Sequence, residues 1–246
     1  MKKTSVLIVL MLFASSCFAE LTAIQTEDSK VFYDGVSKVA EWTYVNGVRA
    51  MQGVTITGDV KITTNIDGND RYAVFKYLRN GIVDGAYTWH FADSNKPSAV
   101  ETYTKGRING PFKSYFKTGK IAKEGVYVAG RKDGEWKTYY SNGEIAEIVN
   151  YKQDSKEGEY IKNYESGANN VACTYVKNKM EGPYMELYET GTRKLEGNYK
   201  AGLRDGDFSM YYESGEKQYT MRYKAGKVLG AVNEEGSEFD PVEVEK

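Results

Sequence analysis

The sequence predicts an all-β protein, an elongated antiparallel β-meander of hairpin repeats that form a single, solenoid-like sheet. Three observations predict this fold: a glycine that recurs every 24 or 25 residues, aromatic residues that recur in step with it, and a polar turn that ends each aromatic segment. The recurring glycines are Gly85, Gly110, Gly134, Gly158, Gly182, Gly206 and Gly230. In such arrays each repeat packs chiefly on its neighbours.

Aromatic residues stand at fixed distances after each recurring glycine. The first column, two residues after it, holds Tyr87, Phe112, Trp136, Tyr160, Tyr184 and Phe208. The second column, six residues after it, holds Phe91, Phe116, Tyr140, Tyr164, Tyr188 and Tyr212. A tyrosine column follows seventeen residues after the glycine, with one shift for the longer first repeat: Tyr103, Tyr127, Tyr151, Tyr175, Tyr199 and Tyr223. Aromatic residues favour strands and alternate residues share a face, so the first two columns are predicted to form one core-forming face.

Each repeat contains two predicted turns. The first is a polar pair followed by glycine, as in Ser-Asn-Gly at 141–143 and Glu-Thr-Gly at 189–191, which is typical of a type I turn closed by a left-handed glycine. The second follows the tyrosine column, where Gly106, Gly130, Gly202 and Gly226 open a Gly-x-x-x-Gly connection to the next hairpin. Asp154 and Asn178 replace this glycine in two repeats, and such residues tolerate positive φ best.

The pattern Gly-x-x-x-Gly-x-aromatic-x-x-Tyr-Tyr-x-x-Gly, followed by Tyr-x-x-Gly, resembles the bacterial variant of the MORN repeat found in YwqK-like proteins. The resemblance covers roughly residues 77–230 and, more loosely, 31–76. It implies a hairpin-repeat fold and no particular reaction, because the family is named for its repeat.

The resemblance also carries functional labels. YwqK-like proteins are often labelled antitoxins, and MORN proteins have been linked to membrane lipids and to phosphatidylinositol phosphate kinases. A cytoplasmic antitoxin should lack the export signal described below, which argues against that label. The sequence has neither a phosphate-binding glycine loop with its lysine nor a metal-binding acid pair in a kinase context, so we expect no enzymatic activity.

Residues 1–19 are predicted to be a signal peptide. Lys2 and Lys3 precede an apolar run at 6–13, which is too short to span a bilayer, and small residues lead to Ala19. Cleavage after Ala19 is favoured. The rival is a lipoprotein signal with Cys17 acylated, although the leucine usual three places before such a cysteine is absent. Both alternatives predict export to the periplasm, the cell surface or the medium, with a lipid anchor at Cys17 in the second.

Three further segments are expected after the signal peptide. Residues 20–76 form degenerate N-terminal β-repeats or a cap, with turn signals at 33–35, 46–47 and 67–68. Residues 77–230 are the regular array. Residues 231–246 are an acidic tail, expected to be disordered or to cover the last strand.

Composition excludes several classes of partner and site. Removing Lys2 and Lys3 leaves 31 basic against 34 acidic residues, a charge of −3, so nucleic acid is not an expected partner. If cleavage follows Ala19, the mature chain keeps Cys173 alone, which excludes an intramolecular disulfide, and His90 lacks a recognisable catalytic partner. An acid precedes most recurring glycines: Asp84, Asp133, Glu157, Glu181 and Asp205, with Asn109 in the same place. Their spacing of about 10 Å favours turn charges over a shared cation site.

The sequence therefore predicts no catalytic, cofactor or metal site. We expect an exported, non-catalytic scaffold that binds a partner protein through an extended tyrosine-rich sheet, and a carbohydrate- or envelope-binding module is the alternative. Tyr115, Tyr139 and Tyr211 lie five residues after the recurring glycine, on the opposite face, and are the candidate exposed binding residues. The predicted structural residues are Gly110, Gly134, Gly158, Gly182, Gly206, Trp136, Tyr127, Tyr151, Tyr175, Tyr199 and Tyr223. The partner, the binding face and the oligomeric state stay open.

Overall fold

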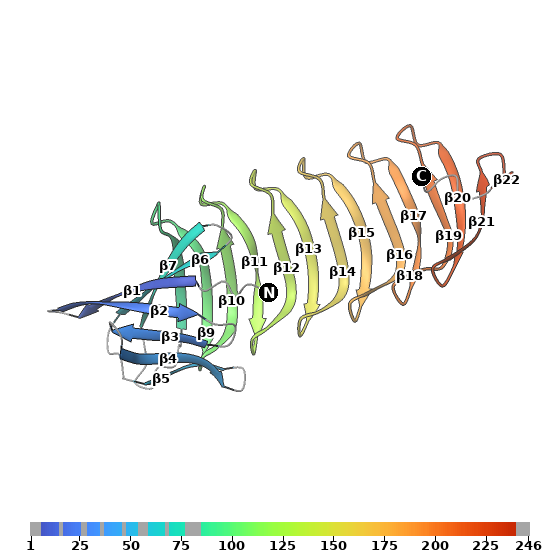
Figure 1. Ribbon diagram of the computed structural model, residues 1–246. Coiled ribbons are helices and arrows are strands. Elements are labelled where there is room, and N and C mark those ends of the chain that lie inside the picture. Colours follow the sequence, from blue (N-terminus) through green and yellow to red (C-terminus); the bar gives the residue numbers. More distant parts are fainter. Residues whose placement is uncertain are drawn as a thin grey trace. The chain divides into compact units, whose positions relative to one another are not determined.

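Every regular element that the computed structural model describes is a β-strand (Figure 1). It describes residues 85–239 continuously, with side chains to residue 238, and in residues 1–84 the backbone of seven strands. The chain divides into two compact units, residues 1–131 and 132–246. No helix of the described residues is long and apolar enough to cross a membrane.

The first unit begins with strands whose order in the sheet departs from their order in the chain. These are β1 (Val6–Ala14), β2 (Cys17–Gln25), β3 (Ser29–Asp34), β4 (Ser37–Val45), β5 (Val48–Gly53), β6 (Asp59–Ile66) and β7 (Asn69–Lys76). Antiparallel pairings run β5-β4-β3-β2-β1-β6-β7, so β1 lies between β2 and β6. Of the turn predicted at 33–35, Tyr33 and Asp34 are the last residues of β3; residue 35 and the turns predicted at 46–47 and 67–68 lie outside the described residues.

Strand β1 and the first residues of β2 lie within residues 1–19, the predicted signal peptide, which the structure includes. Their pairing leaves the predicted cleavage after Ala19 untested, and the boundaries predicted at residues 19, 76 and 230 rest on the sequence alone. Residues 77–84, the predicted start of the regular array, lie outside the described residues.

The repeats follow as successive antiparallel hairpins. The first unit continues with β8 (Gly85–Phe91), β9 (Pro97–Thr104), β10 (Arg107–Tyr115) and β11 (Ile121–Val128). The second contains β12 (Arg131–Tyr139, entering at residue 132), β13 (Ile145–Lys152), β14 (Ser155–Asn163), β15 (Asn169–Val176), β16 (Lys179–Leu187), β17 (Arg193–Lys200), β18 (Leu203–Arg204), β19 (Gly206–Tyr211), β20 (Lys217–Lys224), β21 (Lys227–Asn233) and β22 (Glu238–Phe239). Within each unit consecutive repeat strands pair antiparallel, which confirms the predicted meander.

The acidic segment after residue 230 is partly strand. The end of β21 and all of β22 lie within 231–246, and Glu238 pairs with Val232, so β22 covers the edge of β21. Residues 240–246, the rest of the predicted tail, lie outside the described residues.

The predicted glycine turns are confirmed. In one repeat the Gly143 N–H donates to the Tyr140 carbonyl at 3.0 Å, and the Tyr140 N–H donates to the Glu144 carbonyl at 2.8 Å. Gly143 has φ +104° and Gly191 has φ +87°, both in the left-handed region that favours glycine.

The second turn is tighter than the predicted Gly-x-x-x-Gly connection. Lys200 pairs with Leu203, so Ala201 and Gly202 alone form the loop, with φ of 53° and 85°. Two positive φ angles define a type I′ turn, whose twist suits a two-residue hairpin. The same pair of left-handed residues occurs at 105–106, 129–130, 153–154, 177–178 and 225–226. The sequence indicated the second residue of each pair and missed the first.

In the middle repeats the recurring glycine lies inside a strand, at a bulge, as Gly158 shows. Val149 pairs with Tyr160 and Tyr151 with Lys156, so residues 157–159 oppose a single residue, and Gly158 has φ +101°. The bulge therefore requires the left-handed glycine that the period marks.

Candidate binding surface

One face of the repeat sheet carries the aromatic core. In each described repeat the first-column ring meets the tyrosine-column ring edge-on, as in Trp136–Tyr151 with centroids 6.4 Å apart and Phe208–Tyr223 with centroids 5.3 Å apart. Trp136 and Phe208 are 3% and 2% exposed, which confirms that this face is a core. Edge-to-face geometry is the favourable arrangement of aromatic quadrupoles.

Basic side chains of the same repeats cover several of these rings. The Lys132 ammonium lies 4.7 Å from the Trp136 ring centroid and 5.0 Å from that of Tyr151. Lys156 stands at the equivalent place over Tyr160 and Tyr175, and Arg204 over Phe208 and Tyr223. Through these cation–π contacts, side chains of the protein itself cover part of the aromatic face.

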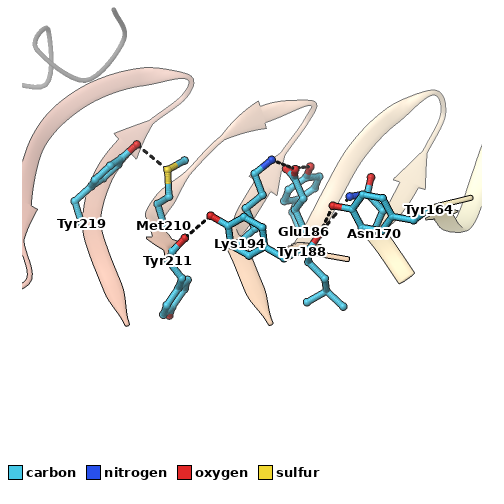
Figure 2. A network of polar contacts seen from close by, with 10 residues as sticks. Tyr164, Asn170, Glu186, Tyr188, Lys194, Met210, Tyr211 and Tyr219 are labelled. Carbon is cyan, nitrogen blue, oxygen red and sulfur yellow. Dashed lines mark hydrogen bonds and ion pairs between the residues drawn. The ribbon is translucent and has the colours of Figure 1, made fainter. Parts of the chain in front are cut away.

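The second-column tyrosines join neighbouring repeats at the glycine-turn end. Their hydroxyls donate to backbone carbonyls of the next repeat: Tyr140 to Asn163 at 2.7 Å, Tyr164 to Leu187 at 2.8 Å and Tyr188 to Tyr211 at 2.9 Å. Figure 2 shows Tyr164 and Tyr188 in this arrangement. These three rings therefore link neighbouring repeats, whereas Tyr212, the second-column tyrosine of a later repeat, is 48% exposed and is not part of the core.

The acids before the recurring glycines join neighbouring repeats at the other end. Four of them accept a backbone N–H from the first left-handed residue of the next type I′ turn: Gln153 to Asp133 at 3.2 Å, Lys177 to Glu157 at 2.8 Å, Ala201 to Glu181 at 2.6 Å and Ala225 to Asp205 at 3.2 Å. Asn109 accepts likewise from Ala129 at 2.9 Å. Asp84 lies outside the described residues. The interpretation of these acids as solvated turn charges, made from the sequence, missed this contact. The one sequence feature that indicated it is that Asp, Glu and Asn, which all carry a side-chain oxygen acceptor, replace one another at this position. The described residues hold no cluster of three or more metal-ligating side chains.

The capping contact at Asp205 makes stability depend on pH. The backbone N–H of Ala225, and then Lys224, hold the pKa of this carboxyl below its ordinary value. A carboxylate with a lowered folded pKa contributes stability above its unfolded pKa, and the contribution disappears as pH falls through the lower folded value. Asp205→Ala should therefore lower the melting temperature at pH 7, and the gap from the natural protein should close below about pH 3.

Asp205→Asn is the matched control for this experiment. It keeps an acceptor of the kind that Asn109 supplies, so its melting temperature should lie between the other two at pH 7. A gap between the natural protein and Asp205→Ala that is the same at pH 7 and pH 2.5 would contradict the prediction.

The candidate tyrosines occupy the face opposite the core. Tyr139 and Tyr211 follow Trp136 and Phe208 by three strand positions, which places them on the other side, and both are half-buried. The Tyr211 hydroxyl donates to Glu196, and burial and this carboxylate raise the pKa of Tyr211. Tyr115 has the equivalent position in the first unit and is also half-buried.

A row of apolar residues crosses this same face in the second unit. Ile148 pairs with Ile161, Ile161 with Ala172, and Ala172 with Met185, so four adjacent strands present neighbouring apolar side chains. Because Val149 faces the core, its neighbour Ile148 and the whole row face away from it. Met185 is 37% exposed and the others are half-buried. We call these four residues the apolar row.

Cys173 and His90 both lie within strands of the repeats. Cys173 lies on the core face, 8% exposed, and burial raises the pKa of its thiol. His90 lies within β8, where it pairs with Tyr72 and Pro97. Both are accounted for as strand residues.

Stacked antiparallel hairpins with an aromatic core face define a class, the all-β hairpin-repeat proteins. The family model of the MORN repeat variant matches residues 108–129, 132–153 and 204–225, so the chain carries MORN repeats of the variant type. Such repeats indicate a repeat-containing scaffold or binding module. No curated protein was found to match the chain.

Proposed function

We propose that the protein is an exported, non-catalytic scaffold that binds another protein through the face of its second unit opposite the aromatic core. The apolar row carries this proposal. Around Trp136 and Tyr160 the core face is covered by Lys132 and Lys156, whereas the row offers partly exposed apolar surface on the other face.

The geometry of the row suits a short apolar segment of a partner. Four strands spaced by about 4.8 Å give a row about 14 Å long, the length of two to three helical turns. Lys137, ion-paired with Glu135 at 2.8 Å, borders Ile148 at one end, and Glu196, ion-paired with Arg193 at 3.3 Å, borders Met185 at the other, so a charged pair flanks the row at each end. Tyr139 and Tyr211 lie on the same face and supply the aromatic anchors that interfaces favour.

Site-specific crosslinking of the mature protein in its own envelope fraction tests the proposal. A photoreactive residue at Met185 should capture a protein partner, and the same residue at Asn198, an exposed polar position on the same face, is the matched control. The products should be scored for protein, glycan and lipid. Capture of glycan or lipid alone, or equal capture from both positions, would refute binding of a protein through the apolar row.

Substitutions separate binding from folding. Tyr139→Ala with Tyr211→Ala should leave the protein folded and weaken partner capture by at least about tenfold, because each removes an aromatic anchor. Trp136→Ala should instead cost about 3–5 kcal/mol of stability, because it empties a buried site. Thermal melts and capture should be measured on the same preparations. If the tyrosine variant unfolds while Trp136→Ala is tolerated, the two faces are assigned in reverse.

Export is the second part of the proposal, supported by the signal-peptide pattern of residues 1–19. A reporter fused after residue 19 should cross the inner membrane, and globomycin should leave processing unchanged if cleavage follows Ala19. An uncleaved precursor under globomycin would instead establish Cys17 as a lipid anchor. A reporter that stays in the cytoplasm would contradict export.

A further inference from the structure

A pocket of about 180 Å³ opens on the core face of the second unit, among β17 to β20. Its walls are apolar and aromatic: Leu195, Phe208, Met210, Tyr219, Met221 and Tyr223. The tyrosine hydroxyls donate to methionine sulfurs, Tyr219 to Met210 Sδ at 2.9 Å and Tyr223 to Met221 Sδ at 3.1 Å (Figure 2 shows the first pair). Both hydroxyls thus donate to weak thioether acceptors.

Arg204 completes the lining and brings a charge to it. Its guanidinium lies 5.0 Å from the Phe208 ring centroid and 5.2 Å from that of Tyr223, and Nη1 donates to Tyr223 Oη at 2.8 Å. The side chain is half-buried. A guanidinium has five N–H donors, so tyrosine hydroxyls use only part of its capacity.

No carboxylate among residues 85–238 forms an ion pair with Arg204. The nearest acids in sequence are engaged elsewhere: Asp205 pairs with Lys224 at 3.3 Å, and Asp207 pairs with Arg222 at 2.9 Å. The pocket therefore holds a half-buried cation without an anion, an arrangement that a bound carboxylate would stabilise.

Lys132 and Lys156 occupy the same repeat position as Arg204 and also lie over two rings. A cation over the aromatic pair is thus a structural feature of these repeats. Arg204 lines the pocket described above, and its planar fork matches a carboxylate through two parallel hydrogen bonds where lysine offers a point charge.

We propose that this pocket binds a small carboxylate with an apolar or aromatic body. A cavity of about 150 Å³ accommodates benzene, so 180 Å³ suits a body near the size of a phenyl ring. The carboxylate would pair with Arg204 while the body contacts Leu195, Met210 and Met221. This chemistry has three possible sources: a free acid, the C-terminus of a peptide, and the acidic residues 240–246 of the chain itself.

The test uses the full mature chain with methyl-labelled methionine, followed by NMR. Phenylacetate should shift the Met210 and Met221 methyl resonances saturably, and the isosteric neutral phenylacetamide should bind at least about tenfold more weakly, because it lacks the charge that Arg204 pairs with. N-acetylphenylalanine distinguishes the peptide source, since tighter binding than phenylacetate would indicate a chain terminus.

Variants at the cation position separate recognition from folding. Arg204→Lys keeps a cation of the kind found at Lys132 and Lys156, so it should stay folded and lose most of the preference for acid over amide. Lys156→Gln should leave phenylacetate binding unchanged. Equal binding of acid and amide by the natural protein, or an unchanged preference in both Arg204→Lys and Arg204→Gln, would overturn the proposal.

A further experiment, removal of residues 240–246, tests whether the chain's own tail occupies the pocket. If phenylacetate shifts the methionine methyls only after residues 240–246 are removed, the pocket has the proposed chemistry and the tail is its resident occupant. If neither the full chain nor the shortened chain responds to phenylacetate or N-acetylphenylalanine, the pocket does not bind carboxylates.

Discussion

Gly197→Ala should lower the free energy of unfolding by about 1–3 kcal/mol, the usual cost of forcing atoms into a packed core. A Cβ at this position would lie 2.5 to 2.7 Å from Cδ1, Cγ and Cδ2 of Phe208. Phe208 is 2% exposed, and its edge-on contacts with Tyr199 and Tyr223 hold the ring against Gly197. The backbone of Gly197 is not left-handed, and the cost is one of packing alone.

Gly230→Ala is the control for this substitution. Gly230 also lies in a strand without positive φ, and nothing lies within 4 Å of the Cβ that alanine would add. We expect a change below about 0.5 kcal/mol there. Thermal melts should resolve the difference, at about 2–4 °C for each kcal/mol in a chain of this length. Equal melting temperatures for the two variants would show that Phe208 is not fixed against Gly197.

Gly191→Val should lower the free energy of unfolding by about 1–2 kcal/mol or more. Gly191 has φ +87°, and nothing lies within 4 Å of an added Cβ, so the whole cost comes from placing a β-branched residue in the left-handed region. Gly143, with φ +104°, should behave alike. Chemical denaturation measures the change. Gly191→Asn should lower the free energy of unfolding by less than Gly191→Val, because asparagine tolerates positive φ.

The type I′ turn offers the reverse experiment. Ala201 has φ +53°, a conformation that costs an L-residue about 1 kcal/mol, so Ala201→Gly should stabilise the protein by a similar amount. Gly191→Val and Ala201→Gly should therefore shift the denaturation midpoint in opposite directions. Shifts of the same sign would mean that local conformation does not govern these turns.

The repeat, the strands and the core face were predictable because their signals are local. Aromatic residues such as Trp136 and Tyr151 stand at the same place in each repeat. Alternation along a strand assigns each side chain to a face of the sheet without knowledge of the neighbouring strands. The glycine at each turn is likewise a local requirement. The left-handed Ala201 was not predictable, because alanine disfavours that region and only the two-residue hairpin imposes it.

The contacts between repeats depend on register, which the sequence did not reveal. Glu181 reaches the N–H of Ala201 twenty residues later because a bulge sets the acid opposite the next turn. The apolar row has the same origin: Ile161 and Met185 become neighbours through Ala172 only after the strands are aligned. The candidate tyrosines were placed on the predicted face, but the apolar row beside them was missed.

Both ends of the repeats in the second unit are fastened to the next repeat, by tyrosine hydroxyls at the glycine turns and by carboxylates at the type I′ turns. In a linear array, cooperativity depends on how the coupling between neighbours compares with the stability of each repeat alone. A repeat that opens here breaks side-chain contacts at two edges as well as its strand pairing. We expect the interior repeats to exchange their amide hydrogens together, as one unit, with fraying confined to the terminal repeats.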